Sequence, residues 1–175
     1  MWLDNLKLFQ FKNYDTFNAS FNASLNAITG PNGLGKTNLL DAIHYLALTK
    51  SAFYKNDRYS IKTGSDYFII KGLFRMAEKQ FQIKCGFQEG KKKEIVNDKV
   101  TYETKSDHIG RFPIVFIAPQ DTAIITESSE ARRKFFDNVI SQIDIRYLRN
   151  LLHYNYILKR RQLLLKQFAD EKRCD

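Results

Sequence analysis

The chain has 175 residues, of which 43% are hydrophobic and 27% are charged. These values are close to those of globular proteins and exclude general disorder, and the length allows one domain, or one domain and the start of another. The formal net charge of +9 favours an acidic partner such as nucleic acid, although a soluble domain can also simply be basic.

Cysteine content and the N-terminus bear on the compartment. Two cysteines are too few for a disulfide framework, which favours a reduced, cytoplasmic protein. The first residues, MWLDNLKLFQF, lack a basic region followed by an apolar one, so no signal peptide is expected. The sequence has no apolar run long enough to cross a bilayer, and no membrane partner is expected.

The first predicted elements are strands. Residues 2–11 and 14–21 are separated by the turn-prone sequence KNYD. Residues 25–29 (LNAIT) are expected to form a short buried strand that enters a glycine-rich loop. After this loop apolar residues recur at helical spacing, which predicts a helix. Residues 51–66 are polar and irregular, as is typical of a surface loop.

Strand signals continue in the middle of the chain. Strands are expected from Tyr67 and from Phe81, and residues 91–102 are typical of a hairpin that turns at Asn97-Asp98. Several short strands in series indicate an antiparallel sheet beside the parallel sheet that the glycine loop implies. The apolar run FPIVFIA, residues 112–118, predicts another buried strand.

The last third of the chain changes character. Residues 129–141 and 144–168 predict two helices, the second long and rich in Leu, Tyr, Lys and Arg. The predicted fold class is therefore α/β, a P-loop nucleotide-binding core with an antiparallel β-subdomain and the start of a helical arm. We expect the core in residues 1–122 and the start of the arm in residues 123–175.

The glycine loop satisfies the pattern G-x-x-x-x-G-K-[ST] and is placed between an apolar segment and a helix. Glycines allow the backbone to wrap around phosphate groups, and the start of the following helix adds electrostatic attraction. The pattern predicts ATP binding, with Lys36 on the β- and γ-phosphates and the Thr37 hydroxyl as a ligand of Mg²⁺. The alternative is a flexible turn with a solvent-facing lysine. The candidate cofactor-binding residues are Gly30, Pro31, Asn32, Gly33, Leu34, Gly35, Lys36, Thr37 and Asn38.

Hydrolysis needs more than this loop. A P-loop enzyme also holds Mg²⁺ with a carboxylate at the end of another strand and orients the attacking water. The nearest candidate, Asp121, follows an apolar run but is separated from it by Pro119 and Gln120. Gln120 could contact the metal or the water, although a glutamine in a turn is the simpler interpretation. No catalytic residue is assigned.

The order of motifs along the chain resembles that of the bacterial recombination mediator RecF family. The segments that carry the resemblance are LKLFQFKNY, ITGPNGLGKTNLLDAIHYLAL, KSAF, FIAPQD, SSEARRKFFDNVISQID and YLRNLLHYNYILKRRQLLLK. They follow one another over nearly the whole chain. The P-loop is shared by many ATPases, whereas its combination with EARRKFFD and YNYILKRRQLLLK is much more specific.

This resemblance implies a head domain similar to those of SMC-type ABC ATPases without the long coiled coil. It implies an ATP-dependent homodimer on single-stranded or gapped DNA that acts with RecO and RecR to load RecA. The corresponding roles are in recombinational repair, replication-fork recovery and the SOS response. The resemblance also implies a weak ATPase activity that DNA stimulates. Its signature motif and Walker B aspartate are expected beyond Asp175, so the 175-residue chain alone is expected to be inactive.

Two departures from the family pattern limit what can be transferred. Many members carry an arginine near the positions of Phe53 and Tyr54 that is thought to contact the nucleotide, and no such role is transferred here. An acidic residue often stands beside the aspartate of the FIAPQD segment, which leaves a metal role for Gln120 open.

Basic residues are concentrated in the predicted arm. They could form a track for the DNA backbone, because phosphate contacts supply most sequence-independent affinity. They could equally be the solvated face of helices whose leucines pack elsewhere. The candidate DNA-binding residues are Arg132, Arg133, Arg160 and Arg161. The run Lys91-Lys92-Lys93 is interpreted as a charged edge that discourages strand pairing, with DNA contact as the alternative.

Alternatives to the ATP-dependent DNA switch stay open, and one of them is a different SMC-type P-loop ATPase head. A P-loop phosphotransferase would need an acceptor site and a mobile lid, which the predicted β-meander and helical arm fit poorly. A non-catalytic module would use its nucleotide for stability alone.

Overall fold

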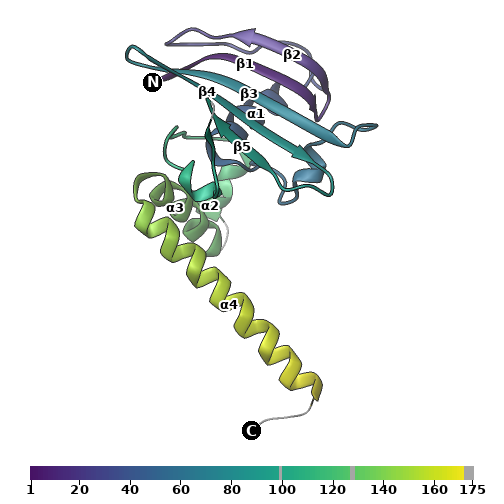
Figure 1. Cartoon of the computed structure of the whole chain (residues 1–175), viewed down its shortest axis with the longest axis vertical. Coiled ribbons are helices and arrows are strands. Elements are labelled where there is room, and N and C mark those ends of the chain that lie inside the picture. Colours follow the sequence, from purple (N-terminus) through teal and green to yellow (C-terminus); the bar gives the residue numbers. More distant parts are fainter. Residues whose placement is uncertain (99, 127–128, 172–175) are drawn as a thin grey trace. The chain divides into compact units, whose positions relative to one another are not determined.

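The computed structural model describes residues 1–98, 100–126 and 129–171 of the chain (Figure 1). The chain divides into two compact units, residues 1–116 and the residues from 117 onward. The division expected from the sequence, with an ATPase core through residue 122, stays a prediction.

A six-stranded antiparallel sheet is the framework of the first unit, with the strand order β2-β1-β3-β4-β5-β6. Its side chains alternate as the period of a strand requires, since Ile83 and Cys85 of β4 are buried whereas Lys84 between them is partly exposed. The strands are β1 (Trp2–Phe11), β2 (Tyr14–Ser20), β3 (Tyr67–Met76), β4 (Lys79–Gln88), β5 (Glu94–Asn97) and β6 (Val100–Thr101).

Helix α1 (Lys36–Leu48) covers one face of this sheet (Figure 1). Most of its apolar residues are buried, although Leu40 is exposed, and Leu46 approaches β3 so closely that a Cβ atom on Gly72 would lie 2.5 Å from Leu46 Cδ1. Tyr45 of the helix packs edge-on against Phe68, with ring centroids 5.2 Å apart. The apolar core therefore lies between α1 and the sheet, and it fixes the helix that follows the glycine loop.

Most of the predicted elements of this unit are confirmed. The strand and hairpin signals correspond to β1 through β6, and the predicted helix corresponds to α1. Asn97 pairs with Val100, which agrees with the hairpin predicted here, and residue 99 lies outside the described residues. The predicted surface loop contains one short 3₁₀ helix, η1 (Asp57–Ser60), and a second, η2 (Lys105–Asp107), follows β6.

Two predicted buried strands are wrong. Residues 25–29 and 112–118 contain no strand, and Leu25, Val115 and Ile117 are each more than 80% exposed. An apolar segment becomes a strand only when a neighbour accepts its backbone hydrogen bonds. Among the described residues no strand pairs with either segment, and the sheet described contains no parallel pair.

Helices make up the second unit, as the sequence predicts. Asp144 begins the longest one, because its Oδ1 accepts a hydrogen bond of 2.8 Å from the backbone N–H of Arg146. Tyr147 Oη also donates to Asp137 and ties this helix to the preceding one. Within the described part of the chain no helix is both long and apolar enough to span a membrane. The helices are η3 (Pro119–Thr122), α2 (Ala123–Thr126), α3 (Ser129–Ile143) and α4 (Ile145–Glu171).

Candidate nucleotide-binding site

The glycine loop joins β2 to α1, and three of its glycines have backbone angles that L-residues rarely adopt. The φ angles are 144° at Gly30, 85° at Gly33 and 96° at Gly35. Gly35 is also the N-cap of α1 and provides no side-chain cap, and the first turn carries no acidic residue. The N–H groups at the start of α1 and the positive end of its dipole are therefore available to an anion.

Hydrogen bonds from the turn between β1 and β2 support this loop. Asn13 Nδ2 donates a hydrogen bond of 3.1 Å to the carbonyl oxygen of Leu34, and Tyr14 Oη donates one of 3.1 Å to that of Gly35. Asn38 Nδ2 in turn donates to Asn13 Oδ1 at 2.8 Å. Burial raises the pKa of Tyr14, which keeps its hydroxyl protonated and able to donate.

Gly35 is required sterically as well as conformationally. A Cβ atom at this position would lie 2.5 Å from Asn13 Nδ2 and 2.6 Å from its Oδ1. Asn13 and Tyr14 support the candidate site through these hydrogen bonds, and the sequence prediction did not include them. The available signal was the KNY segment at the end of the first strand, which was part of the family resemblance but carried no assigned role.

Lys36 lies against the loop that precedes it. Its Nζ donates hydrogen bonds of 2.8 Å to the carbonyl oxygens of both Gly30 and Pro31. The next residue, Thr37, is exposed in the first turn of α1. The structure thus brings together the two residues that the sequence predicts for phosphate and magnesium.

A buried ion pair anchors the other side of α1. Lys12 Nζ lies 2.6 Å from Asp41 Oδ2, and both side chains are buried. Asp41 also accepts hydrogen bonds from the hydroxyl of Ser51 at 2.8 Å and from the backbone N–H of Ala52 at 2.6 Å. The end of β1, the second turn of α1 and the loop after α1 are therefore joined by one carboxylate.

A second ion pair, with a buried lysine and a partly buried aspartate, lies near the C-terminal end of α1. Lys93 Nζ is 2.6 Å from Asp57 Oδ2 and donates a hydrogen bond of 2.7 Å to the carbonyl oxygen of Thr49. Asp57 also accepts a hydrogen bond of 2.6 Å from Tyr45 Oη. Because the Lys93 side chain is only 5% exposed, its interpretation as part of a charged edge is wrong, whereas Lys91 and Lys92 are exposed.

A hollow of about 510 Å³ adjoins the glycine loop through Asn13 and Asn38. Two exposed aromatic side chains flank it, with the ring centroids of Tyr54 and Tyr59 5.8 Å apart. Its polar and aromatic lining suits a planar, partly polar ligand. The lining residues are Lys12, Asn13, Asn38, Tyr54, Tyr59, Ile61, Lys62 and Thr63.

Of the two candidate residues near the start of the arm, Asp121 forms a hydrogen bond within its own turn. Asp121 Oδ2 accepts a hydrogen bond of 2.7 Å from the backbone N–H of Ala118, within its own turn. The side chain of Gln120 lies outside what the structure describes. Across residues 1–98, 100–126 and 129–171, no three His, Cys, Asp or Glu side chains form a group that could hold a metal ion.

The predicted DNA-binding arginines are exposed on two helices, with Arg132 and Arg133 on α3 and Arg160 and Arg161 on α4. The guanidinium of Arg160 lies 5.7 Å from the centroid of the Tyr156 ring. Of the leucines on α4, Leu148 is buried whereas Leu152 and Leu165 are about half exposed within this unit. The DNA role of these arginines stays a prediction.

Comparison with known proteins decides the family. The sequence profile described as an AAA domain matches residues 5–173. The chain belongs to the AAA domain family. It is also 47% identical over 170 residues to the DNA replication and repair protein RecF of Cytophaga hutchinsonii, a match that covers 97% of this chain and 45% of that protein. The chain spans about half the length of the curated relatives that it matches.

Solved structures agree with this assignment. A structure of the recombination mediator protein RecF with ATPrS, in the RecFOR pathway, superimposes with a TM-score of 0.91 at 32% identity. That match covers 99% of this chain and 47% of the other. The SMC head domain from Thermotoga maritima, at 19% identity, shares the fold with a TM-score of 0.57 and covers 73% of this chain and 52% of its own.

These likenesses confirm the resemblance to RecF and the predicted fold class. The chain has the fold of a P-loop ATPase head of the RecF and SMC kind, with an antiparallel sheet and helices. The geometry of the glycine loop can accordingly be interpreted as that of an AAA-domain protein.

Proposed function

We propose that this chain carries the P-loop half of a RecF-type ATP-binding site. The observation that supports this most strongly is the cradle formed by the positive φ angles of Gly30, Gly33 and Gly35 and the uncapped start of α1. Such a cradle suits a polyphosphate, because backbone N–H groups and the helix dipole both favour negative charge. The similar RecF structure named above was solved with ATPrS.

Each residue of the loop has a distinct role in this proposal. Backbone N–H groups between Gly30 and Asn38 hold the phosphates, and the ammonium of Lys36 neutralises the β- and γ-phosphates. The Thr37 hydroxyl, an exposed oxygen donor beside Lys36, would be a ligand of the Mg²⁺ ion that accompanies the nucleotide and would offset its negative charge. Bound ATP would supply the free energy that favours one conformation of the protein over another.

The hollow beside the loop fits the rest of the nucleotide. Asn13 and Asn38 lie both in its lining and in the hydrogen-bond network that supports the loop. A base placed there would meet the rings of Tyr54 and Tyr59. We assign this hollow to the adenine and ribose of the same ATP molecule.

The complete protein is proposed to be an ATP-dependent DNA-binding mediator of recombinational repair. ATP would drive homodimerisation on single-stranded or gapped DNA in the cytoplasm, together with RecO- and RecR-type partners. Replication-fork recovery and SOS induction would follow from that role. The 47% identity to a DNA replication and repair protein RecF and the net charge of +9 support this assignment.

Hydrolysis is expected to be negligible for the 175-residue chain alone. Its nearest candidate carboxylate, Asp121, accepts a hydrogen bond from the backbone N–H of Ala118 within its own turn. Steady turnover of ATP by the purified 175-residue chain would contradict this expectation.

Substitution of Lys36 tests the nucleotide site. In the complete protein, Lys36→Met should abolish binding of Mg·ATP in a titration, together with ATP-dependent dimerisation and retention on DNA. Lys79→Met is a matched control, because Lys79 is an exposed lysine of β4. Undiminished ATP binding by Lys36→Met would overturn the nucleotide site, and undiminished retention on DNA would overturn the switch.

A further inference from the structure

Three lysines stand side by side on the face of the sheet that α1 does not cover. Lys7 of β1 is directly opposite Lys71 of β3, and Lys71 is directly opposite Lys84 of β4. Lys7 lies between the fully buried Leu6 and Leu8, so its side chain projects away from the core. With neighbouring strands about 4.8 Å apart, the row spans about 10 Å.

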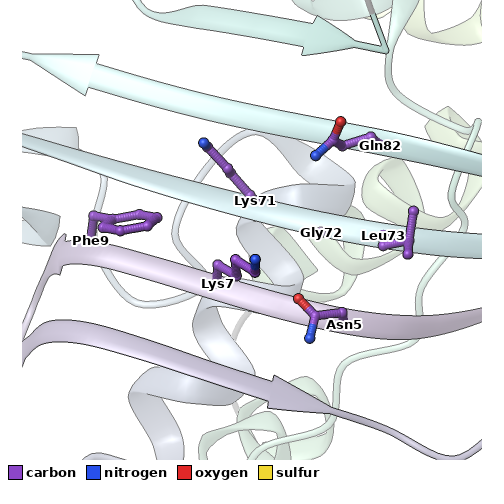
Figure 2. Close-up of a pocket in the computed structure, with 7 residues that line it drawn as sticks. All are labelled: Asn5, Lys7, Phe9, Lys71, Gly72, Leu73 and Gln82. Carbon is purple, nitrogen blue, oxygen red and sulfur yellow. The ribbon is translucent and has the colours of Figure 1, made fainter.

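A hollow of about 260 Å³ lies along this row (Figure 2). Figure 2 shows side chains from β1, β3 and β4 around it, with the amides of Asn5 and Gln82 close to the lysines. Two lysines and no carboxylate line the hollow. Its residues are Asn5, Lys7, Phe9, Lys71, Gly72, Leu73 and Gln82.

The charge of this row is only partly neutralised. Lys84 pairs with Glu94 at 2.7 Å. Lys7 and Lys71 form no ion pair within the described residues, and Lys71 Nζ lies 5.7 Å from the centroid of the Phe9 ring. Like charges directly opposite each other on a sheet are destabilising, by up to about 1 kcal/mol for a pair. The pair of Lys7 and Lys71, which no carboxylate offsets among the described residues, indicates a surface arranged for an anion.

Protection of a sheet edge does not explain these lysines. Lysines are common on edge strands, where they discourage pairing with another chain. Strands β1, β3 and β4 are interior strands, each paired on both sides. Lysine stems can also cover apolar surface, but that accounts for the position of the methylene groups and not for the convergence of the charges.

We propose that this lysine row, Lys7, Lys71 and Lys84, binds the phosphodiester backbone of nucleic acid. The proposal rests on the DNA-binding part of the proposed function and places a contact surface at the sheet. A neutral amide such as that of Gln82 is a frequent donor to sugar and phosphate oxygens, beside Lys and Arg, whereas Asn5 Nδ2 already donates to Asn18 and Ser20. Successive phosphates of one strand advance about 3.4 Å along a duplex, so a row of about 10 Å faces roughly three of them.

A second hollow, of about 430 Å³, extends the basic surface from Lys84 toward β5. Lys84, Lys91 and Lys92 line it together with Glu94, which pairs with Lys84 and leaves Lys91 and Lys92 as its further positive charges. The charges available to a bound strand therefore continue beyond the row itself. A polyanion with many regularly spaced charges fits this distribution better than a single small anion.

The test is the salt dependence of DNA binding by the complete protein with Mg·ATP present. We expect Lys7→Gln/Lys71→Gln to weaken binding roughly tenfold and to lower the slope of log K against log[salt] by about 1.8 for duplex or 1.4 for single-stranded DNA. Each single substitution should give about half of that change in slope. Lys7→Arg/Lys71→Arg should restore both quantities, and Lys79→Gln, which removes the same charge elsewhere on β4, should change neither.

Nucleotide binding is the second measurement for every variant. Unchanged Mg·ATP affinity shows that a variant is folded and that its loss of DNA affinity comes from the substituted lysines. If the unsubstituted protein binds DNA and the double Gln variant binds with the same affinity and slope, the lysine row is overturned while the proposed function stands. If the unsubstituted protein does not bind DNA at any salt concentration, both are overturned.

Discussion

Lys12 and Asp41 form an ion pair inside the protein, with 2.6 Å between Lys12 Nζ and Asp41 Oδ2. Lys12 lies in the supporting turn directly after β1, and Asp41 lies in the helix that follows the glycine loop. The ammonium is also surrounded by aromatic rings, with Nζ 4.9 Å from the centroid of Tyr54 and 5.2 Å from that of Phe53. One interaction therefore fixes the loop's helix relative to the strand below it and to the loop that follows.

Removal of Lys12 should be strongly destabilising. Lys12→Met leaves Asp41 buried without its counter-ion, which typically costs about 3–5 kcal/mol of unfolding free energy. Urea denaturation measures this loss. Lys134→Met breaks the exposed pair between Lys134 and Glu130 and should cost less than about 0.5 kcal/mol. Equal losses in the two variants would contradict the structural role given to Asp41.

Two neighbouring lysines should respond differently to the same substitution. Lys93→Met leaves the partly buried Asp57 without its cation and should lower the unfolding free energy by about 1–3 kcal/mol. Lys92→Met changes an exposed side chain and should stay within about 0.5 kcal/mol of the unsubstituted protein. Thermal or urea unfolding of both variants distinguishes them, and a mild effect of Lys93→Met would argue against the buried pair.

Stability should decrease on acidification because of His108. Burial lowers the pKa of His108, whose Nε2 donates to the Leu46 carbonyl oxygen at 2.6 Å while its buried Nδ1 lacks a hydrogen-bond partner in the described structure. Below the unfolded-state pKa of about 6.5, the unfolded chain binds a proton that the folded chain does not. The unfolding free energy therefore decreases as the pH decreases.

Denaturation curves between pH 5 and pH 7.5 test this, with His108→Gln as the comparison. The variant should show a shallower decline below about pH 6.5, by up to about 1.4 kcal/mol per pH unit. Burial also lowers the pKa of His44, which makes a similar contribution to the pH dependence of both proteins. Identical pH profiles would show that His108 titrates in the folded state as it does in the unfolded state.

Cys85 should be chemically inert in the folded protein. It is fully buried on β4, and burial raises the pKa of its thiol to about 12, so almost no thiolate is present near neutral pH. In a Cys174→Ser background, a thiol reagent should react only after denaturant is added. Rapid labelling under native conditions would mean that the sheet opens around β4.

Gly35 should be irreplaceable for a different reason from other glycines. Gly35→Ala combines a left-handed backbone with a Cβ atom 2.5 Å from Asn13 Nδ2, and should lower both stability and Mg·ATP affinity. Gly90→Ala has a φ of 77° but no atom within 4 Å of the added Cβ, so it should cost about 1 kcal/mol and leave nucleotide binding unchanged. Isothermal titration with Mg·ATP separates the two, and equal affinities would contradict the contact with Asn13.

Local signals were sufficient for much of the fold. The alternation in β4, the turn between β5 and β6 and the periodicity of α1 are properties of a few consecutive residues. The glycine loop was predictable for the same reason, because its φ angles and its phosphate chemistry depend on residue types at fixed spacing. These features required no knowledge of distant segments.

The errors and omissions concern partners that are distant in sequence. Lys93 is one of three consecutive lysines, and only its approach to Asp57 makes it a buried residue. Asn13 supports Leu34 across 21 positions, which no short motif records. The apolar segment that contains Leu25 has strand composition, but the described structure provides it with no neighbouring strand.

The pairing of β1 with β3 has a consequence for synthesis on the ribosome. Phe9 is paired with Ile69, and the glycine loop and α1 lie within the chain between them. Until β3 (Tyr67–Met76) has emerged, β1 can pair only with β2, and a two-stranded hairpin is marginally stable by itself in water. The platform beneath α1 is therefore completed late, and chaperones that bind emerging apolar segments have a defined interval in which to act.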